Sequence, residues 1–166
     1  MKKINVIGYS GSGKTYLIKK FIHRLKNEFN LESAVIKNIH EHQIDKEGKD
    51  SFIYTKKGAN YAITKNAYDE TTIFIKKKVN IEDLIDWISK GPFRGDVVFT
   101  EGFRDLKIPT ILCLETIEKY REQKNENVKI ISGNISILSE RKEIDNLPIL
   151  NIDKSFNRFI EIFNIV

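Results

Sequence analysis

Residues 8–15 read GYSGSGKT and fit the pattern Gly-x-x-x-x-Gly-Lys-Thr. The loop joins an apolar run, residues 4–7, to a stretch with helical periodicity, which is the context that phosphate-binding loops require. Backbone N–H groups and the helix dipole bind phosphate oxygens there. Lys14 would add a positive charge for the β- and γ-phosphates, and Thr15 a hydroxyl for Mg²⁺. The pattern predicts a nucleoside triphosphate site, which kinases, GTPases and assembly factors share.

A carboxylate usually faces the phosphates in such a site and binds Mg²⁺ directly or through water. DVVFTEG, residues 96–102, reads as a buried strand, and Glu101 lies at its carboxyl end, where open parallel sheets bind ligands. Asp96 begins the same strand and would lie at the opposite edge. Lys14 and Glu101 are therefore the predicted catalytic residues, with Thr15 and Glu101 as metal ligands.

A lysine and a polar loop follow the next predicted strand, SAVIK. Lys37 ends that strand, and it either reaches into solvent or contacts a phosphate or a second substrate. The loop after it contains His40, His42 and Asp50 without clear metal-ligand spacing. We interpret it as a switch-like segment that closes over nucleotide and Mg²⁺, with Asp50 as the best candidate for a metal or water contact.

The remaining elements alternate between strands and helices. Strands are predicted at residues 4–8, 33–37, 61–64, 71–77, 96–102, 110–115 and 128–133, and helices at residues 13–29, 51–57, 81–88 and 154–163. This order predicts one α/β domain over residues 1–166, a P-loop NTPase three-layer sandwich whose mostly parallel central sheet carries helices on both faces. The charged connector at residues 115–127 is expected to be mobile, as a solvated face or a docking surface.

Composition narrows the class of protein. The 166 residues include 28 Lys and Arg against 23 Asp and Glu, a net charge of +5 that suits an anionic ligand. Basic and acidic residues alternate, so no nucleic-acid partner is predicted. Cys113, the only cysteine, excludes an internal disulfide and lies in an apolar run as a structural thiol. No apolar run is long enough to cross a bilayer and no signal peptide is recognised, so we expect a cytoplasmic protein without a membrane partner.

Several stretches of the sequence together indicate a particular family more specifically than the phosphate-binding loop alone does. They are IGYSGSGKTYLI, VIKNIHEHQIDKEGKDS, KKGANYAIT, DVVFTEGFRD and KIPTILCLE, in that order over about the first two-thirds of the chain. With them the sequence resembles the MobB family, P-loop proteins of molybdenum-cofactor biosynthesis that assist conversion of molybdopterin to its guanine dinucleotide form.

The resemblance implies GTP binding with Mg²⁺, slow GTP hydrolysis and a homodimer. It also implies action beside a MobA-type guanylyltransferase, with molybdopterin or its guanine dinucleotide as a further ligand. Phosphates and metal would be held by Gly8, Ser10, Gly11, Ser12, Gly13, Lys14 and Thr15. Glu101 would be the acid opposite them, and the variable side of the pocket would be lined by Lys37, His40, Lys49 and Asp50.

The chain also departs from the family pattern. It has KNIHEH after the second predicted strand where the family commonly has Lys-His-Thr-His-His, so the role of His40 and His42 stays open. It contains no Asn-Lys-x-Asp guanine motif. Residues 132–134 and 151–153 are candidates for reading the base. Asp153 could accept hydrogen bonds from guanine, but a role as the N-cap of the last helix is at least as consistent with the sequence.

Three functions remain after these observations. The leading one is a GTP-binding accessory protein that is at most a weak GTPase. The runner-up is an ATP-dependent small-molecule kinase of the P-loop class, although the sequence has no segment of closely spaced arginines to close over ATP. The third is a nucleotide-gated scaffold without chemistry of its own.

Overall fold

The computed structural model describes residues 1–93 and 95–166, which form two compact units. Unit 1 comprises Met1–Asn38 and Ile85–Val166, and unit 2 comprises Ile39–Leu84. The boundary between them falls within helix α3 (Ile81–Lys90). The prediction of one domain over the whole chain stays a prediction.

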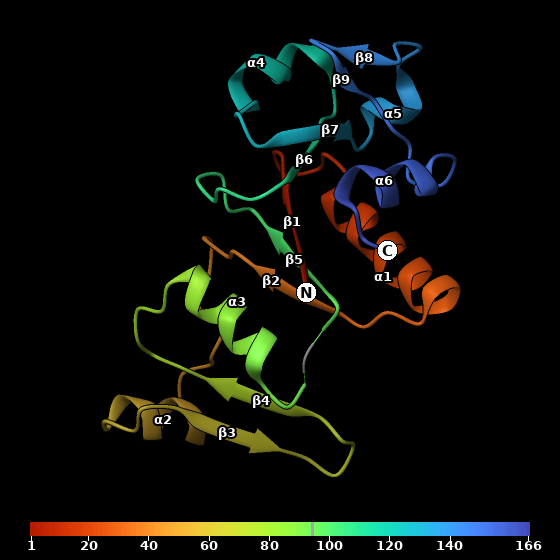
Figure 1. Cartoon of the computed structure of the whole chain (residues 1–166). Coiled ribbons are helices and arrows are strands. Elements are labelled where there is room, and N and C mark those ends of the chain that lie inside the picture. The colour runs from red at the N-terminus through yellow and green to blue at the C-terminus, as the bar shows by residue number, and fades with distance from the viewer. Residues whose placement is uncertain (94) are drawn as a thin grey trace. The chain divides into compact units, whose positions relative to one another are not determined.

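Unit 1 is built on a five-stranded parallel sheet in the order β2-β5-β1-β6-β7 (Figure 1). Its strands are β1 (Lys2–Ile7), β2 (Ser33–Lys37), β5 (Val97–Glu101), β6 (Thr110–Cys113) and β7 (Val128–Ser132). Strand β1 is central, with β5 and β6 on either side. Because the strands are parallel, the segments that follow them all emerge at one edge of the sheet, and the predicted mostly parallel sheet is confirmed.

Helices α1 (Lys14–Phe29) and α6 (Phe156–Phe163) cover one face of this sheet. Phe21 of α1 is fully buried, and its ring lies 5.3 Å from that of Phe99 in β5 and 5.3 Å from that of Phe159 in α6. Burial of such aromatic side chains dominates the energy of a core and fixes how the helices lie on the sheet. Helix α6 begins at Phe156 after an N-cap at Ser155, so Asp153 is not its cap.

The opposite face is covered by short elements. They are η1 (Ile117–Lys119), α4 (Tyr120–Gln123), α5 (Ile135–Leu138) and the two-residue strands β8 (Glu143–Ile144) and β9 (Leu147–Pro148). The connector at residues 115–127 therefore contains two helical turns, and it is anchored by Tyr120, which is buried with Leu112 and Leu114. The expectation of a mobile connector was wrong because it rested on charge density and overlooked this buried aromatic residue.

A polar network lies within the sheet at the level of β1, β5 and β6. Thr100 donates a hydrogen bond to Asn5 Oδ1 at 2.9 Å, and Asn5 Nδ2 donates to the carbonyl of Phe103 at 2.8 Å. Thr110 donates to the carbonyl of Ile108 at 2.8 Å. Asn5, Thr100 and Thr110 are fully buried, so their side-chain polar atoms depend on these bonds in place of water. The network ties the loop after β5 to the central strand.

Unit 2 contains α2 (Asp50–Lys56) and the antiparallel hairpin of β3 (Ala62–Lys65) and β4 (Thr71–Phe74), which lie where strands were predicted at residues 61–64 and 71–77 (Figure 1). Asp50 is the first residue of α2 and Lys49 is its N-cap, so neither Asp50 nor Ser51 caps the helix. The buried Ser51 instead donates to Asp45 Oδ1 at 3.0 Å, and Lys76 lies 3.4 Å from the other oxygen of that carboxylate.

Helices long and apolar enough to cross a membrane are absent from the described residues.

We expect Thr100→Val to destabilise the protein by about 1–3 kcal/mol, because it leaves the buried Asn5 Oδ1 without its donor while barely changing the side-chain volume. Urea unfolding followed by circular dichroism measures the change. Thr71→Val at an exposed position of β4 is the control and should change stability by less than about 0.5 kcal/mol. Equal stabilities of the two variants would show that the network contributes nothing.

Candidate functional site

The loop of residues 8–15, here called the phosphate loop, connects β1 to α1 as predicted. Its three glycines have positive φ angles of 147° at Gly8, 77° at Gly11 and 94° at Gly13. Alternation of such residues turns successive N–H groups toward one side and forms a concave nest that attracts anions. Gly13 is the N-cap of α1 and supplies no side-chain cap, so the first N–H groups of the helix have no partner within it.

Glycine is required at position 8 because the backbone of β6 and the side chain of Ser12 both approach this residue closely. A Cβ atom at this position would lie 2.3 Å from the carbonyl oxygen of Cys113 in β6 and 2.5 Å from Ser12 Oγ. Only glycine leaves room for both atoms while holding this φ angle.

The loop after β7 braces the phosphate loop from the other side. The Asn134 side chain donates to the carbonyl of Gly11 at 2.8 Å, and the Asn134 backbone N–H donates to the carbonyl of Ser12 at 3.2 Å. A Cβ atom at Gly133 would lie 2.2 Å from that same Ser12 oxygen. The sequence analysis treated residues 132–134 as candidates for reading a base, but it missed this structural role.

The chemistry of the loop fits a bound polyphosphate. Ser12 is 2 % exposed, and its Oγ has no hydrogen-bond partner among the residues that the structure describes. Lys14 Nζ donates to the carbonyl of Tyr9 at 2.8 Å, so its charge is held over the loop. Ser10 and Thr15 are exposed beside it. A buried hydroxyl, an ammonium group and unpaired helix N–H groups together form a donor set for an anion.

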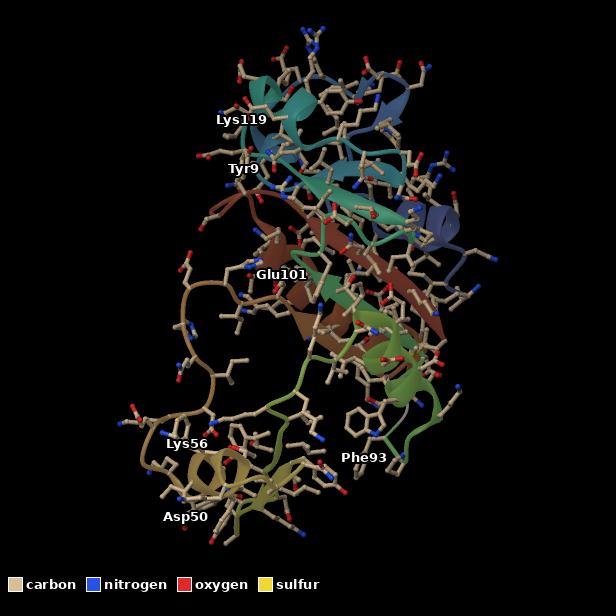
Figure 2. The ribbon with its side chains drawn as sticks, turned by 90° about the vertical axis from the view of Figure 1, so that its left-hand side faces the viewer. Tyr9, Asp50, Lys56, Phe93, Glu101 and Lys119 are labelled. Atoms are coloured by element: carbon tan, nitrogen blue, oxygen red, sulfur yellow. The ribbon has the colours of Figure 1, made fainter. Side chains whose placement is uncertain are left out.

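Glu101 and Lys37 end neighbouring strands and meet at the sheet edge. They are paired in the parallel register of β2 and β5, with Lys37 Nζ 3.5 Å from Glu101 Oε1. Glu101 is only 6 % exposed, and it is the C-terminal residue of β5, beside the central strand that leads into the phosphate loop (Figure 2). A buried carboxylate needs a cation, and Lys37 supplies one here. The two predicted residues thus form an ion pair, which the sequence analysis did not foresee.

Cys113 lies in the core beneath these groups. Burial raises the pKa of its thiol to about 12, the charge of Glu101 adds to the rise, and the charge of Lys14 opposes it. The thiol therefore stays protonated at physiological pH and is not a nucleophile. Its predicted structural role is confirmed by its complete burial.

Tyr9 of the phosphate loop makes cation–π contacts with two basic side chains. The guanidinium of Arg104 lies 5.0 Å from the ring centroid and the ammonium of Lys119 lies 6.0 Å from it, and Figure 2 shows Tyr9 and Lys119 side by side. The Tyr9 hydroxyl donates to Glu122 at 3.2 Å, and Arg104 donates to Gln123 at 3.3 Å. Arg104 is thus engaged with Tyr9 and Gln123 instead of extending freely over the loop.

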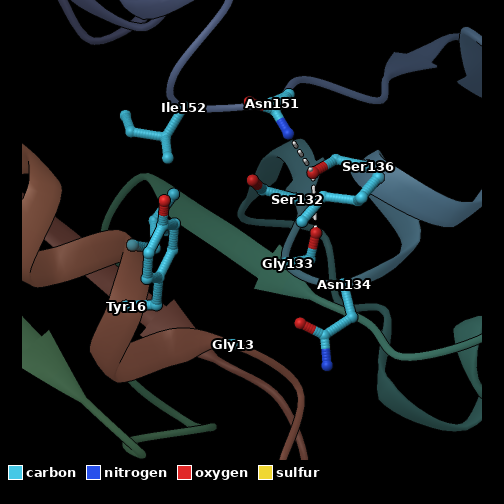
Figure 3. A pocket seen from close by; sticks show the side chains of 10 residues that line it. Gly13, Tyr16, Ser132, Gly133, Asn134, Ser136, Asn151 and Ile152 are labelled. Atoms are coloured by element: carbon cyan, nitrogen blue, oxygen red, sulfur yellow. Dashed lines mark hydrogen bonds between the residues drawn. The ribbon is translucent and has the colours of Figure 1, made fainter.

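A pocket opens next to the start of α1 (Figure 3). It is lined by Gly13, Tyr16, Leu17, Ser132, Gly133, Asn134, Ser136, Ile137, Asn151 and Ile152. Asp153 is not among them, because its carboxylate accepts hydrogen bonds from Tyr16 at 2.7 Å and binds Lys20 at 2.8 Å. The sequence analysis missed Tyr16 and Ser136 as lining residues. Tyr16 follows the phosphate-loop pattern directly but is not part of it, and Ser136 belongs to no recognisable motif.

The remaining predicted residues belong to unit 2. His40, Lys49 and Asp50 are exposed there, and their predicted roles at the nucleotide stay predictions. Within residues 1–93 and 95–166, no group of three or more His, Cys, Asp or Glu side chains is arranged to hold a metal ion.

The fold and the loop define the class of protein: this is a P-loop NTPase fold. Solved structures of the MobB homologue from Bacillus stearothermophilus and of MobB from Bacillus subtilis superpose on it with TM-scores of 0.73 and 0.74. The Bacillus stearothermophilus protein is 15 % identical to this chain, and the match covers 99 % of each chain. The Bacillus subtilis protein is 23 % identical, and the match covers 97 % of this chain and 96 % of the Bacillus subtilis chain. At these identities the likeness establishes the fold.

Sequence comparison identifies the family. The family model for molybdopterin guanine dinucleotide synthesis protein B, MobB, matches residues 3–136, so the chain belongs to the MobB family. A molybdopterin-guanine dinucleotide biosynthesis adapter protein of Haemophilus influenzae is 32 % identical over 147 residues, 86 % of this chain and 80 % of that protein. A putative adapter protein of the same name from Methanocaldococcus jannaschii is 34 % identical over 120 residues, 69 % of this chain, but the match spans only 48 % of that longer protein.

We expect Gly133→Ala to displace the brace from the phosphate loop, because its methyl group would overlap the Ser12 carbonyl. Gly102→Ala is a matched control, since Gly102 has a φ of 87° against 84° at Gly133 and its Cβ would meet no atom closer than 3.5 Å. Gly133→Ala should lower the free energy of unfolding by roughly 1–3 kcal/mol more than the control does. Equal losses measured by thermal unfolding would mean that the close approach is not needed.

Proposed function

We propose that the chain binds GTP with Mg²⁺ and acts as an accessory protein in the conversion of molybdopterin to its guanine dinucleotide form. The observation that carries the proposal is the phosphate loop, a glycine nest with a buried, unpartnered Ser12 hydroxyl among the described residues. Membership of the MobB family and the names of the adapter proteins in Haemophilus and Methanocaldococcus support the pathway.

Each residue of the proposed site has a distinct role. The N–H groups of residues 8–15 and the ammonium of Lys14 would hold the phosphates, with the Thr15 hydroxyl and the Glu101 carboxylate on the metal side. A bound Mg²⁺ supplies charge neutralisation to the phosphates. Lys37 would hold the Glu101 carboxylate in place by pairing with it at 3.5 Å.

Any hydrolysis by this site is slow in our proposal. Rapid GTP hydrolysis needs an arginine that neutralises the charge developing on the phosphates. Arg104 is the arginine next to Glu101 in sequence, and it is engaged with Tyr9 and Gln123. A rate on the order of 10⁻⁴ to 10⁻² s⁻¹ is expected of an unassisted site. The protein would thus act mainly through a partner, for which a MobA-type guanylyltransferase is our proposal.

Unit 2 supports the proposed homodimer. Ile63 of β3 and Ile73 of β4 are cross-strand partners, and they are 57 % and 38 % exposed. Tyr61 and Ile75 extend the same hairpin and are 58 % and 43 % exposed. A two-stranded hairpin is marginally stable by itself, and apolar side chains exposed on one of its faces favour packing against a second copy.

Calorimetric titration with GTP·Mg²⁺ and ATP·Mg²⁺ tests the nucleotide. We expect tighter binding of GTP, and Lys14→Ala should weaken it by roughly 10–150-fold, the value of a charged hydrogen bond of about 1.5–3 kcal/mol. Lys19→Ala, at an exposed position of α1, should bind as the wild type does. A preference for ATP would instead favour the small-molecule kinase, and turnover measured with and without the guanylyltransferase separates a GTPase from a scaffold.

Light scattering after size-exclusion chromatography tests the dimer. Ile73→Lys should convert a dimeric wild type to the mass of a monomer, because a charge cannot be buried at the hairpin without a partner. Leu138→Lys in unit 1, at a side chain that is 74 % exposed, should leave the mass unchanged. A monomeric wild type, or a dimer that survives Ile73→Lys, would contradict this part of the proposal.

A further inference from the structure

The pocket at the start of α1 shares Gly13 with the phosphate loop and is open to solvent on one side. It is therefore continuous with the proposed phosphate site. Tyr16 comes from the first turn of α1, and the opposite wall comes from the loops after β7 and β9 (Figure 3). A nucleotide whose phosphates lie in the loop has its base within reach of this pocket.

The walls suit a flat ring. Tyr16 lines one side, and its hydroxyl is held by Asp153 at 2.7 Å, which fixes where the aromatic ring stands. The bond to Lys20, together with that from Tyr16, lowers the pKa of Asp153, so the carboxylate that anchors the ring stays ionised. Ile137 lines the pocket as well and is 67 % exposed, an aliphatic surface that the core does not use. Aromatic and aliphatic walls are the surfaces on which bases stack.

Asn151 presents a fixed donor at the other side. Its side-chain oxygen accepts hydrogen bonds from the backbone N–H groups of Asp153 at 2.9 Å and Lys154 at 3.3 Å. Both partners are donors, so the orientation of the amide is determined and the nitrogen faces the pocket. Figure 3 shows this nitrogen directed toward Ser136, whose Oγ is 3.5 Å away.

The amide nitrogen retains a hydrogen for a ligand. Ser136 Oγ donates to the carbonyl of Gly133 at 2.6 Å, so toward Asn151 it acts as an acceptor and occupies one of the two amide hydrogens. When a base enters the pocket, the other amide hydrogen loses its bond to water. That loss is compensated only if the base offers an acceptor in its place. The 6-oxo group of guanine or hypoxanthine is such an acceptor, whereas the 6-amino group of adenine is a second donor.

We propose that this pocket is the base subsite and that Asn151 selects 6-oxopurines through its amide N–H. The inference rests on the proposed function, because it concerns the same nucleotide. No lining residue is a carboxylate among the described residues, so the 2-amino group of guanine has no charged acceptor there. We therefore assign the selection to the 6-oxo group, and the 2-amino group has no part in it in this proposal.

Binding of GTP, ITP and ATP, each with Mg²⁺, to the wild type and to Asn151→Asp tests the inference. ITP keeps the 6-oxo group and lacks the 2-amino group. The wild type should bind GTP and ITP within about threefold of each other and ATP about tenfold more weakly, the value of one mismatched hydrogen bond. Aspartate preserves the turn, because its carboxylate accepts the same backbone N–H groups, but it presents an acceptor to the base. Asn151→Asp should therefore weaken GTP and ITP about tenfold and retain ATP.

Asn66→Asp is the matched control. Asn66 caps a turn in the same way, accepting from the N–H groups of Tyr68 at 2.9 Å and Glu70 at 3.1 Å, but it lies in the hairpin of unit 2. It should bind all three nucleotides as the wild type does. Circular dichroism of both variants verifies that they fold.

The outcomes separate the two proposals. Failure of the wild type to bind any of the three nucleotides overturns the proposed function and this inference with it. Binding that Lys14→Ala weakens, with a ratio of GTP to ATP affinity that is unchanged in Asn151→Asp, overturns the base subsite alone. Equal wild-type affinities for GTP and ATP, or an ITP affinity tenfold below that of GTP, also overturn it while nucleotide binding stands.

Discussion

The site depends on one close approach between two backbone segments, where the carbonyl of Ser12 packs against Gly133 with no space for a side chain. Two hydrogen bonds from Asn134, to the carbonyls of Gly11 and Ser12, hold the segments together. The phosphate loop is therefore shaped by the loop that follows β7, more than a hundred residues further along the chain. A loop of three positive-φ glycines would have high conformational entropy by itself, and this brace limits it to one shape.

The parallel sheet brings the chemical groups to this place. The phosphate loop follows β1, Glu101 ends β5 and Lys37 ends β2, so all three lie at the carboxyl-terminal edge of the sheet. The buried bonds of Asn5 to Thr100 and Phe103 hold the segment after β5 against the central strand. The sheet register pairs Lys37 with Glu101 and so places a positive charge beside the buried carboxylate, which makes the register part of the electrostatics of the site.

The sequence predicted those features that local patterns encode. The phosphate loop, the amphipathic helix α1 and the buried run ending in Glu101 each have a short-range signature, and the structure places them as expected. Contacts between distant segments have none. The ion pair of Lys37, the brace at Gly133 and the pocket between Tyr16 and Asn151 each join residues that become neighbours only when the sheet forms. Short helical turns were missed for a related reason, since α4 is held by the burial of Tyr120 and not by any periodicity of its own.

A crystal structure with a non-hydrolysable GTP analogue and Mg²⁺ would test the account most directly. The account predicts the phosphates within the nest of residues 8–15, the metal next to Thr15 and Glu101, and the base in the pocket with its 6-oxo group toward Asn151. An analogue bound elsewhere, or phosphates in the nest with the base outside this pocket, would contradict it. An analogue bound elsewhere would refute the phosphate site, and a base outside the pocket would refute the base subsite alone.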